Sequence, residues 1–325
     1  MGSFSQQPVT PRVDRSASGD AETVELIRQV AEGNFAGFRD YLARARADAD
    51  WQDRIFVLER VAPKVSIDAL DAACRSEPEA ADLLVIRCAY YANLAATMRG
   101  TGTSDQVTAA RYQNSAECVK AAMNDMGVST KLDDKDPTAY TLVIRPLTIF
   151  SQVELQKQAF ARATEIVPDL VPAHFAIISA LSERWGGSHV ASVSFAREAL
   201  SKVGPGSDMT ACLFWAHTLV RTHFTDFNKD VHASKRYASK TEVVSELNGA
   251  FENWLNPSYV ARRSSIPYLY KASQWYRATA DLHRLKRVVA FTGEELNITS
   301  NWWEPPQPKS SAKSGSFLSR LFGGK

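Results

Sequence analysis

The tripeptide Phe-Ala-Arg occurs twice in this chain, at residues 160–162 and 195–197, with a period of 35 residues. A small residue, Ala163 or Ala199, follows each copy, and a proline lies five or six residues further on. A fixed period of this length is typical of helical hairpins that stack, because each hairpin covers the apolar face of the next one. The repeat therefore predicts an all-α superhelical stack that works by presenting a surface.

Apolar residues recur at helical spacing along most of the chain, and no apolar run alternates with polar residues as a strand would. The pattern predicts that ordered structure begins at Asp20, and that Pro146 kinks or ends its helix. Polar composition predicts a solvated loop over 127–136 and a basic insertion between paired helices over 224–240. In the second half of the chain we expect helices at about 137–150, 152–166, 172–184, 189–202, 208–223, 241–255 and 267–291, the last of which has room for two helices.

The repeated units match a known helical family at their second helices and depart from it at their first. Over about residues 137–205 each unit carries an aromatic residue, Phe160 or Phe195, then a small residue and a terminal proline. In this respect the chain resembles tetratricopeptide repeats, although the glycine of the first helix is absent both times. The run Ala173–Arg197 also resembles a group of uncharacterised bacterial helical-repeat proteins. These resemblances imply a right-handed superhelix and a binding role, and they bring no catalytic residue and no cofactor.

Composition divides the chain into segments of different character. The ends are rich in Ser, Pro, Gln or Lys and lack periodicity, whereas the middle is periodic throughout. We therefore expect a disordered leader at 1–19, an N-terminal helical region at 20–136, a tetratricopeptide-like region at 137–300, a Trp/Pro/Ser/Lys-rich linker at 301–316 and a short amphipathic motif at 317–325.

The net charge of +2 conceals an asymmetry between the two ends of the chain. Residues 20–82 contain eight Lys/Arg and fourteen Asp/Glu, whereas residues 221–325 contain sixteen Lys/Arg and nine Asp/Glu. If the fold is linear, the molecule is electrically polar along its length, and such a field orients a charged partner without identifying it.

The cysteines and the hydropathy pattern indicate a reducing compartment. None of the cysteines forms a C-x-x-C pair, and each lies among apolar helical neighbours, so we expect free buried thiols, with a disulfide as the alternative. No apolar segment has the length of a signal peptide or a membrane span, which predicts a cytoplasmic location. The four cysteines are Cys74, Cys88, Cys118 and Cys212.

The turn at 185–188, Trp-Gly-Gly-Ser, has two interpretations. Backbone amides at the start of the next helix are able to hold an anion, with a basic side chain on either side. Alternatively, the two glycines form a tight turn, the serine caps the helix and the tryptophan packs on the neighbouring unit. The residues of this candidate anion site are Arg184, Gly186, Gly187, Ser188 and His189.

Residues 259–290 form the candidate partner surface. They contain seven Lys/Arg and a single acid, Asp281, with five Tyr or Trp residues interleaved. Cations beside aromatic faces suit acidic peptides and, more weakly, nucleic-acid backbones. The alternative is a terminal repeat whose aromatic side chains pack while its arginines are solvated or pair with the acidic N-terminal part. The residues expected to contact a partner are Arg262, Arg263, Tyr270, Lys271, Trp275 and Arg277.

Two further candidates lie near the C-terminus. The adjacent Trp302 and Trp303 are expected either to cap the last repeat or to dock on a partner. The last nine residues form an amphipathic segment, for which we expect docking on a partner or on the protein itself, with weak contact to a membrane surface or an idle tail as the alternatives. The apolar face of this segment consists of Phe317, Leu318, Leu321 and Phe322.

No motif assigns a reaction. The six histidines show no H-E-x-x-H pattern, and no phosphate-binding or nucleophile motif occurs, so we expect no metal, no cofactor and no enzyme activity. We expect a scaffold that binds a protein or peptide partner, possessing an acidic surface, on the concave face of the stack. The first alternative is an enzyme or small-ligand protein with a pocket near Trp185, His189 and His217. Nucleic-acid binding through the basic C-terminal unit is the weaker alternative.

Overall fold

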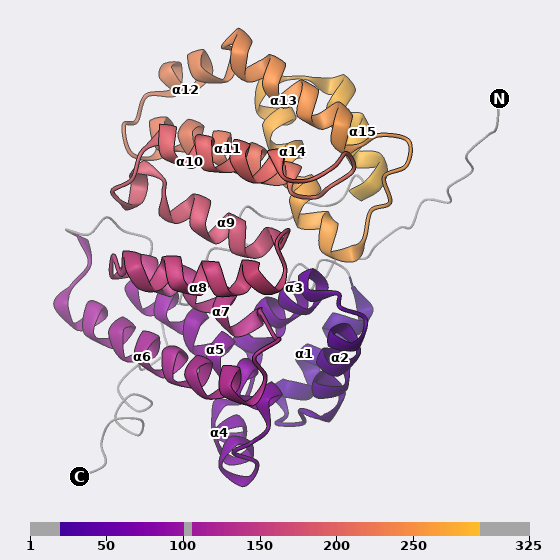
Figure 1. The fold of residues 1–325 in the computed structure, drawn as a ribbon. Helices are drawn as coiled ribbons and strands as arrows, with labels where there is room; N and C mark the ends of the chain where they lie inside the picture. The colour runs from indigo at the N-terminus through magenta and orange to yellow at the C-terminus, as the bar shows by residue number, and fades with distance from the viewer. Residues whose placement is uncertain (1–19, 101–105, 293–325) are drawn as a thin grey trace.

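The computed structural model describes residues 20–100 and 106–292, and their regular structure is entirely helical (Figure 1). Fifteen α-helices and no strand occur among these residues, which confirms the all-α prediction for them. The predicted leader at 1–19, linker at 301–316 and motif at 317–325 lie outside the described residues. The helices are α1 (Ala21–Ala31), α2 (Ala36–Ala47), α3 (Trp51–Val61), α4 (Ile67–Ser76), α5 (Ala81–Arg99), α6 (Ala109–Leu132), α7 (Thr138–Ile149), α8 (Val153–Ile166), α9 (Val171–Ala180), α10 (His189–Ser201), α11 (Thr210–Asp226), α12 (Val231–Ala238), α13 (Thr241–Trp254), α14 (Ile266–Thr279) and α15 (Leu282–Thr292), with short 3₁₀ turns η1 (Ala62–Lys64), η3 (Glu183–Trp185) and η4 (Arg263–Ser265).

Several helix boundaries follow from local chemistry that is visible in the sequence. The Asp20 carboxylate accepts a hydrogen bond from the Glu22 amide, so Asp20 caps α1 as predicted. Gly100 ends α5 at a φ of 80°, a left-handed conformation that favours glycine. Pro146 does not end α7, because the helix continues to Ile149.

The expected loop is helical over residues 127–132, so that prediction was wrong there, and the expected insertion contains a helix of its own. α6 continues through the expected loop at 127–136 as far as Leu132. The expected insertion at 224–240 contains α12, which Asp230 caps by accepting a hydrogen bond from the Ala233 amide.

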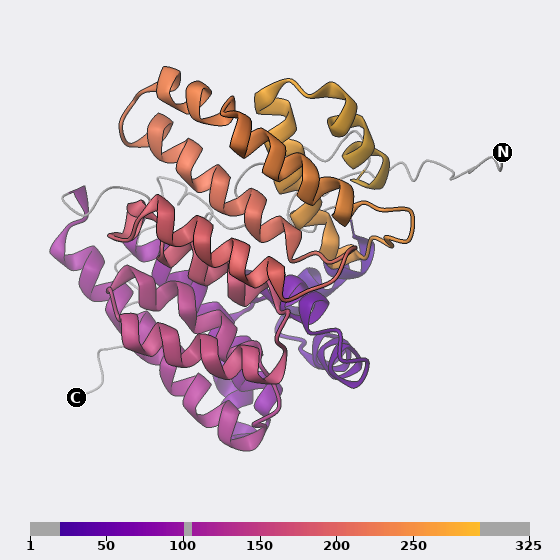
Figure 2. The same cartoon turned by 45° about the horizontal axis from the view of Figure 1, so that its top comes forward.

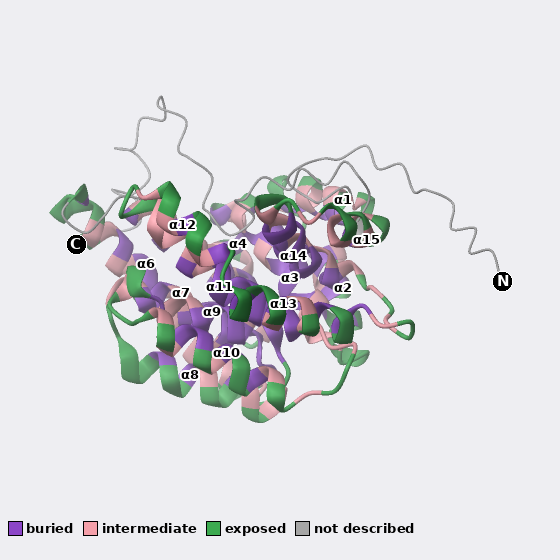
Figure 3. Ribbon diagram, turned by 90° about the horizontal axis from the view of Figure 1, so that it is seen from above, coloured by how far each residue is buried: buried purple, intermediate pink, exposed green. Residues whose placement is uncertain are grey.

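Helices α6 to α13 lie side by side in successive tiers in both views of the ribbon (Figures 1 and 2). Within these tiers α5, α7, α9 and α11 contact one another in sequence, and α14 packs on α11. Consecutive helices also pair, as α7 with α8 and α10 with α11. Seen from above, α9, α11 and α14 are largely buried, whereas α8 and α10 present exposed residues (Figure 3). We call α5, α7, α9, α11 and α14 the inner helices.

The repeated Phe-Ala-Arg tripeptides meet in space. The rings of Phe160 on α8 and Phe195 on α10 lie edge to face with their centroids 5.5 Å apart. The buried imidazole of His174 on α9 contacts both rings, at 5.0 and 6.0 Å. The sequence period of 35 residues thus corresponds to the side-by-side packing of two α-helices on a third.

Two apolar clusters meet at α9. The N-terminal cluster, which extends from Leu26 to Ile177, is mainly aliphatic, whereas the C-terminal cluster, from Val171 to Val288, is rich in aromatic residues. Helix α9 contributes to both, with Ile177 in the first cluster and Phe175 in the second. One helix is therefore a common wall of both cores.

All four cysteines are free and buried, as the sequence predicted. Burial raises the pKa of the Cys74 thiol to about 11 and that of Cys118 to about 12. These thiols are protonated near neutral pH, and a protonated thiol is a poor nucleophile and a poor metal ligand.

Carboxylates from five positions surround two arginines where the N-terminal helices meet the rest of the molecule. Arg54, 1% exposed, donates to Asp82 and Asp136, both at 2.8 Å. Arg263 in η4 donates to Asp20 at 2.6 Å and to Asp53 at 2.5 Å. Its third acidic partner is Glu22 at 3.2 Å. We call this group, Arg54 and Arg263 with Asp20, Glu22, Asp53, Asp82 and Asp136, the acidic junction.

Candidate functional site: a cation-lined cavity on the inner helices

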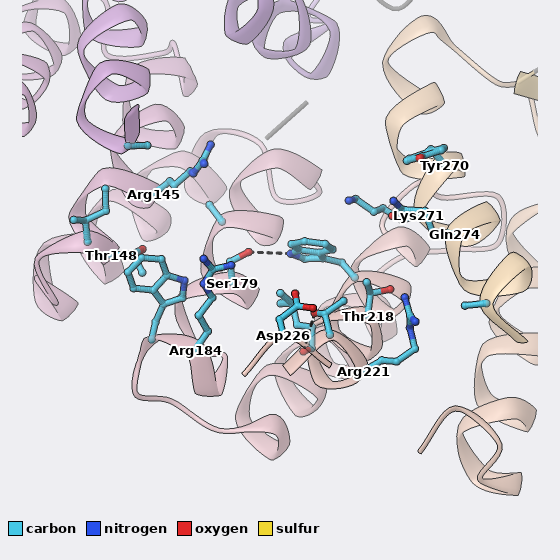
Figure 4. A pocket seen from close by; sticks show the side chains of 18 of the residues that line it. Arg145, Thr148, Ser179, Arg184, Thr218, Arg221, Asp226, Tyr270, Lys271 and Gln274 are labelled. Carbon is cyan, nitrogen blue, oxygen red and sulfur yellow. Dashed lines mark hydrogen bonds between the residues drawn. The ribbon is translucent and has the colours of Figure 1, made fainter. Parts of the chain in front are cut away.

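A cavity of about 590 Å³ lies on the inner helices (Figure 4). Its lining residues come from α5, α7, α9, α11 and α14, from the turn η3 and from Gly100. None of the lining residues belongs to α8, α10, α12 or α13. The cavity is therefore built by the same helices that contact one another along the middle of the fold.

Six basic side chains and one carboxylate line this cavity. The carboxylate is that of Asp226, at the last position of α11. Charges of one sign that converge within low-dielectric walls raise the local concentration of the opposite charge. The cavity is thus suited to an anion. The six basic residues are Arg99, Arg145, Arg184, Arg221, Lys271 and Arg277.

An aromatic platform positions one of these cations. Trp215 on α11 stacks on Phe175 with the ring planes 4° apart, and its indole N–H donates to the Ser179 hydroxyl at 2.9 Å. The Nζ of Lys271 lies 4.3 Å from the centroid of the Trp215 ring, and Lys271 is only 2% exposed. A cation–π contact of this kind stabilises a buried ammonium, because the face of the ring is electron-rich.

A second aromatic residue positions two arginines. The guanidinium carbons of Arg99 and Arg184 lie 5.1 and 5.8 Å from the centroid of the Trp185 ring. Arg184 also lies 5.4 Å from the centroid of the Phe227 ring. Ring faces therefore hold these side chains at the cavity without adding negative charge to its wall.

Two polar groups in the cavity wall lack hydrogen-bond partners among the described residues. They are the Nε of Arg221 and the hydroxyl of Thr218, both on α11 and both buried. Burial lowers the pKa of Arg221, and Asp226 opposes that effect. A buried polar group without a hydrogen-bond partner destabilises the fold. A ligand bound in the cavity would stabilise these two groups by forming hydrogen bonds with them.

The structure separates the partner-binding residues predicted over 259–290. Tyr270, Lys271 and Arg277 on α14 line the cavity, whereas Trp275 is buried in the C-terminal cluster. Arg263 pairs with the acidic N-terminal residues, which is the alternative that the sequence left open for these arginines. Neighbouring Arg262 is exposed and lies 4.0 Å from Asp50. Trp302, Trp303, Phe317, Leu318, Leu321 and Phe322 lie outside the described residues.

The turn that carries the predicted anion site uses its own amides. Those of Gly186, Gly187 and Ser188 donate to the carbonyls of Glu183, Ser182 and Leu181 at 2.9–3.2 Å. A Cβ on Gly187 would lie 2.0 Å from the Leu181 carbonyl oxygen, so the tight turn requires glycine there. The Ser188 hydroxyl accepts from the Ala191 amide and caps α10. Of the five predicted residues, Arg184 alone lines the cavity.

The structure places Trp185, His189 and His217, the residues of the alternative pocket that we expected, in different surroundings. Trp185 lines the cavity, but His217 is buried against α12 and α13, with its ring nitrogens 2.7 Å from the Tyr237 hydroxyl and 3.0 Å from Glu246. His189 instead faces Glu183 and His223, whose donor atoms lie close enough to share a metal ion.

Sequence reasoning missed three of the cations that line the cavity. Arg99, Arg145 and Arg221 come from three different helices and are 46 and 76 residues apart. A signal existed for two of them, because Arg145 in α7 and Arg221 in α11 are each the single Lys or Arg of a largely buried helix. A lone arginine on a buried helix needs a polar environment, which a cavity supplies.

The comparisons with known proteins leave the classification at the level of the fold. No protein-family model and no curated protein matches the sequence. The described chain is an all-helical domain of fifteen packed α-helices. In this part of the chain no helix is both long and apolar enough to cross a bilayer.

Proposed function

We propose that this protein is a binding module that holds an anionic ligand in the cavity of the inner helices. The first candidate ligand is an acidic segment of a protein partner, in which case this protein serves as a scaffold or adaptor. The pairs from α7 to α12 are then degenerate tetratricopeptide-like hairpins, and the inner helices form the concave face of their stack. The contact between Phe160 and Phe195, and the sequential contacts of the inner helices, support this arrangement.

The observation that carries the proposal is the charge of the cavity wall, with six basic side chains and one acid. The unpartnered Nε of Arg221 and hydroxyl of Thr218 add hydrogen-bonding groups that a carboxylate or phosphate would satisfy. Arginine is suited to this because its planar fork binds both kinds of oxyanion with paired hydrogen bonds.

A small anionic ligand is the second candidate, and the size of the cavity favours it. A volume of about 590 Å³ lies in the range of small-molecule sites, roughly 300–1,000 Å³. An acidic peptide would place only a few side chains there and lie along the inner helices on either side. Both ligands present anionic oxygens, so binding experiments distinguish them by using probes of different length.

The test uses the full-length protein and calorimetric titration with three probes, namely a hexaglutamate peptide, inorganic phosphate and tripolyphosphate. We expect the peptide to bind most tightly, and Arg145→Gln and Arg221→Gln each to weaken it by about tenfold or more, because each removes a charge from the binding site. Arg75→Gln is the matched control, since Arg75 is exposed on α4 and loses the same charge outside the cavity. Tripolyphosphate binding without peptide binding selects the small-ligand form.

Salt and truncation separate this proposal from its alternatives. Because attraction between exposed charges is screened, binding should weaken between about 0.05 and 0.5 M salt. A chain that ends at Pro308 should bind the peptide as well as the full-length protein does, since the cavity residues remain. Binding that is insensitive to the cavity substitutions, or absent for all three probes at millimolar concentration, contradicts the proposal.

A further inference from the structure

Glu183, His189 and His223 bring three potential metal ligands together beside the cavity. Glu183 opens η3, His189 is the first residue of α10, and His223 lies in the last turn of α11. One donor atom from each residue lies within 4.8 Å of the other two. This group uses none of the cations that line the cavity.

The separations between these donor atoms suit a small divalent ion. A carboxylate oxygen of Glu183 lies 2.8 Å from the Nε2 of His189, and the other lies 3.8 Å from the Nε2 of His223. Ligands placed tetrahedrally at about 2.0–2.1 Å from a zinc ion are separated by roughly 3.3–3.5 Å. The two observed distances bracket that value, so small side-chain rotations would bring all three donors to one ion.

The burial of His189 and the packing of His223 suit both side chains to bind a metal ion. Burial lowers the pKa of His189, with His223 acting in the same direction and Glu183 opposing it. A lowered pKa favours the neutral imidazole, which is the form that binds metal ions. His223 stacks on Phe227 with the ring planes 13° apart, which fixes its orientation by packing.

An ordinary ion pair at a helix end would explain only part of this arrangement. It accounts for Glu183 and His189, but 3.8 Å is too long for a hydrogen bond from His223. The other ring nitrogen of His223, Nδ1, is buried and has no hydrogen-bond partner among the described residues. His223 thus turns its Nε2 toward the Glu183 carboxylate without bonding to it. A metal ion bound between the two groups would account for this geometry.

We propose that Glu183, His189 and His223 form a binding site for Zn²⁺ or a similar divalent transition metal. Two imidazoles and one carboxylate are a ligand set that zinc accepts with its fourth position open to water or substrate, whereas Ca²⁺ and Mg²⁺ prefer oxygen ligands alone. The side chain of Glu183 is 47% exposed, so the ion has a path from solvent. The next two residues, Arg184 and Trp185, line the cavity, so an ion on Glu183 would also brace that wall.

The test is a titration of full-length, untagged, chelator-treated protein with zinc chloride and cobalt chloride in a buffer without phosphate. We expect one ion per chain by calorimetry and visible absorption bands of four-coordinate Co²⁺. His189→Gln and His223→Gln should each weaken binding by at least about tenfold. His232→Gln is the matched control, because His232 is an exposed histidine on α12 outside the group.

Two results would overturn the site. One is unchanged binding in a chain that carries both His189→Gln and His223→Gln, and the other is no ion bound at micromolar metal. Glu183→Gln provides a variant at an exposed position, where loss of the fold is not expected, and it should also weaken binding. Because protons compete for imidazole, binding should fall as the pH is lowered through the histidine range, a change that an ion held by carboxylates alone would not show.

Discussion

The acidic junction and the cavity surround their arginines with opposite balances of charge. At the junction five carboxylates surround Arg54 and Arg263, whereas six basic side chains and one carboxylate, that of Asp226, line the cavity. Ion pairs fix the junction, and the rings of Trp185 and Trp215 position three of the cavity cations. The difference teaches that the same side chain can stabilise the fold in one region and, on our proposal, contribute to a binding surface in another.

Removal of Arg54 should have the largest effect on stability. Arg54→Ala leaves Asp136, itself 5% exposed, without its partner, and an uncompensated buried charge destabilises a protein by about 3–5 kcal/mol. Urea unfolding followed by circular dichroism measures the loss. A change below about 1 kcal/mol would mean that the junction does not depend on this pair.

Arg263→Gln should have a smaller but clear effect. Its hydrogen bonds to Asp20 and Asp53 are charge-assisted and partly shielded from water, so we expect a loss of about 1–3 kcal/mol in the free energy of unfolding. The adjacent Arg262→Gln is the matched control, because Arg262 is 70% exposed and should change stability by less than about 0.5 kcal/mol. Equal effects of the two substitutions would remove the distinction between these neighbours.

Glu246 on α13 provides an intermediate case, with one carboxylate for two basic partners. Burial opposes its ionisation, but hydrogen bonds from Arg197 and His217 outweigh burial and lower its pKa to about 2. A carboxyl group whose pKa is lowered by folding stabilises the protein above its ordinary pKa of 4.5, and this contribution is lost as the pH falls toward 2.

Glu246→Gln should therefore reduce stability by about 1–3 kcal/mol at pH 7 and flatten the decline between about pH 4.5 and 2. Thermal unfolding of both proteins across that range measures the difference. Parallel declines in the two proteins would show that other carboxyl groups cause the acid sensitivity.

Arg221→Gln should change stability least while it weakens anion binding most visibly. The Nε of Arg221 is buried without a partner, so its replacement by a neutral side chain should change the free energy of unfolding by less than about 1 kcal/mol, or raise it slightly. The peptide titration described above gives the binding loss. A large loss of stability would place Arg221 with Arg54 and end the contrast between the two regions.

The sequence predicted several helices well where apolar periodicity is clear. The expected helix at 152–166 is observed at Val153–Ile166, and the one at 189–202 at His189–Ser201. It failed for residues 127–132, because their polar composition was interpreted as a solvated loop although α6 continues there, and it did not predict α12 within the insertion at 224–240. Composition alone does not show which backbone groups a side chain satisfies.

The candidate site was harder to predict from the sequence than the fold was. The basic residues of α14 were recognised because they are close together in the chain, whereas Arg145 and Arg221 meet them only after α7, α11 and α14 have packed. The group of Glu183, His189 and His223 was missed for the same reason, since its histidines are 34 residues apart. Chemistry assembled from several helices leaves no local motif.

The contact between Arg263 and Asp20 joins positions 243 residues apart in the chain. In an array of helices that contact only their neighbours, the end units fray first, and folding spreads from any point along the array. Here the first helix and the turn before α14 hold each other, so neither can open without breaking the ion pairs of the other. Closure of so long a loop gains its contacts only after the entropy of the intervening chain has been lost. Docking of the N-terminal helices onto η4 is therefore expected to be a late event in refolding, and Arg263→Gln to speed unfolding more than it slows folding.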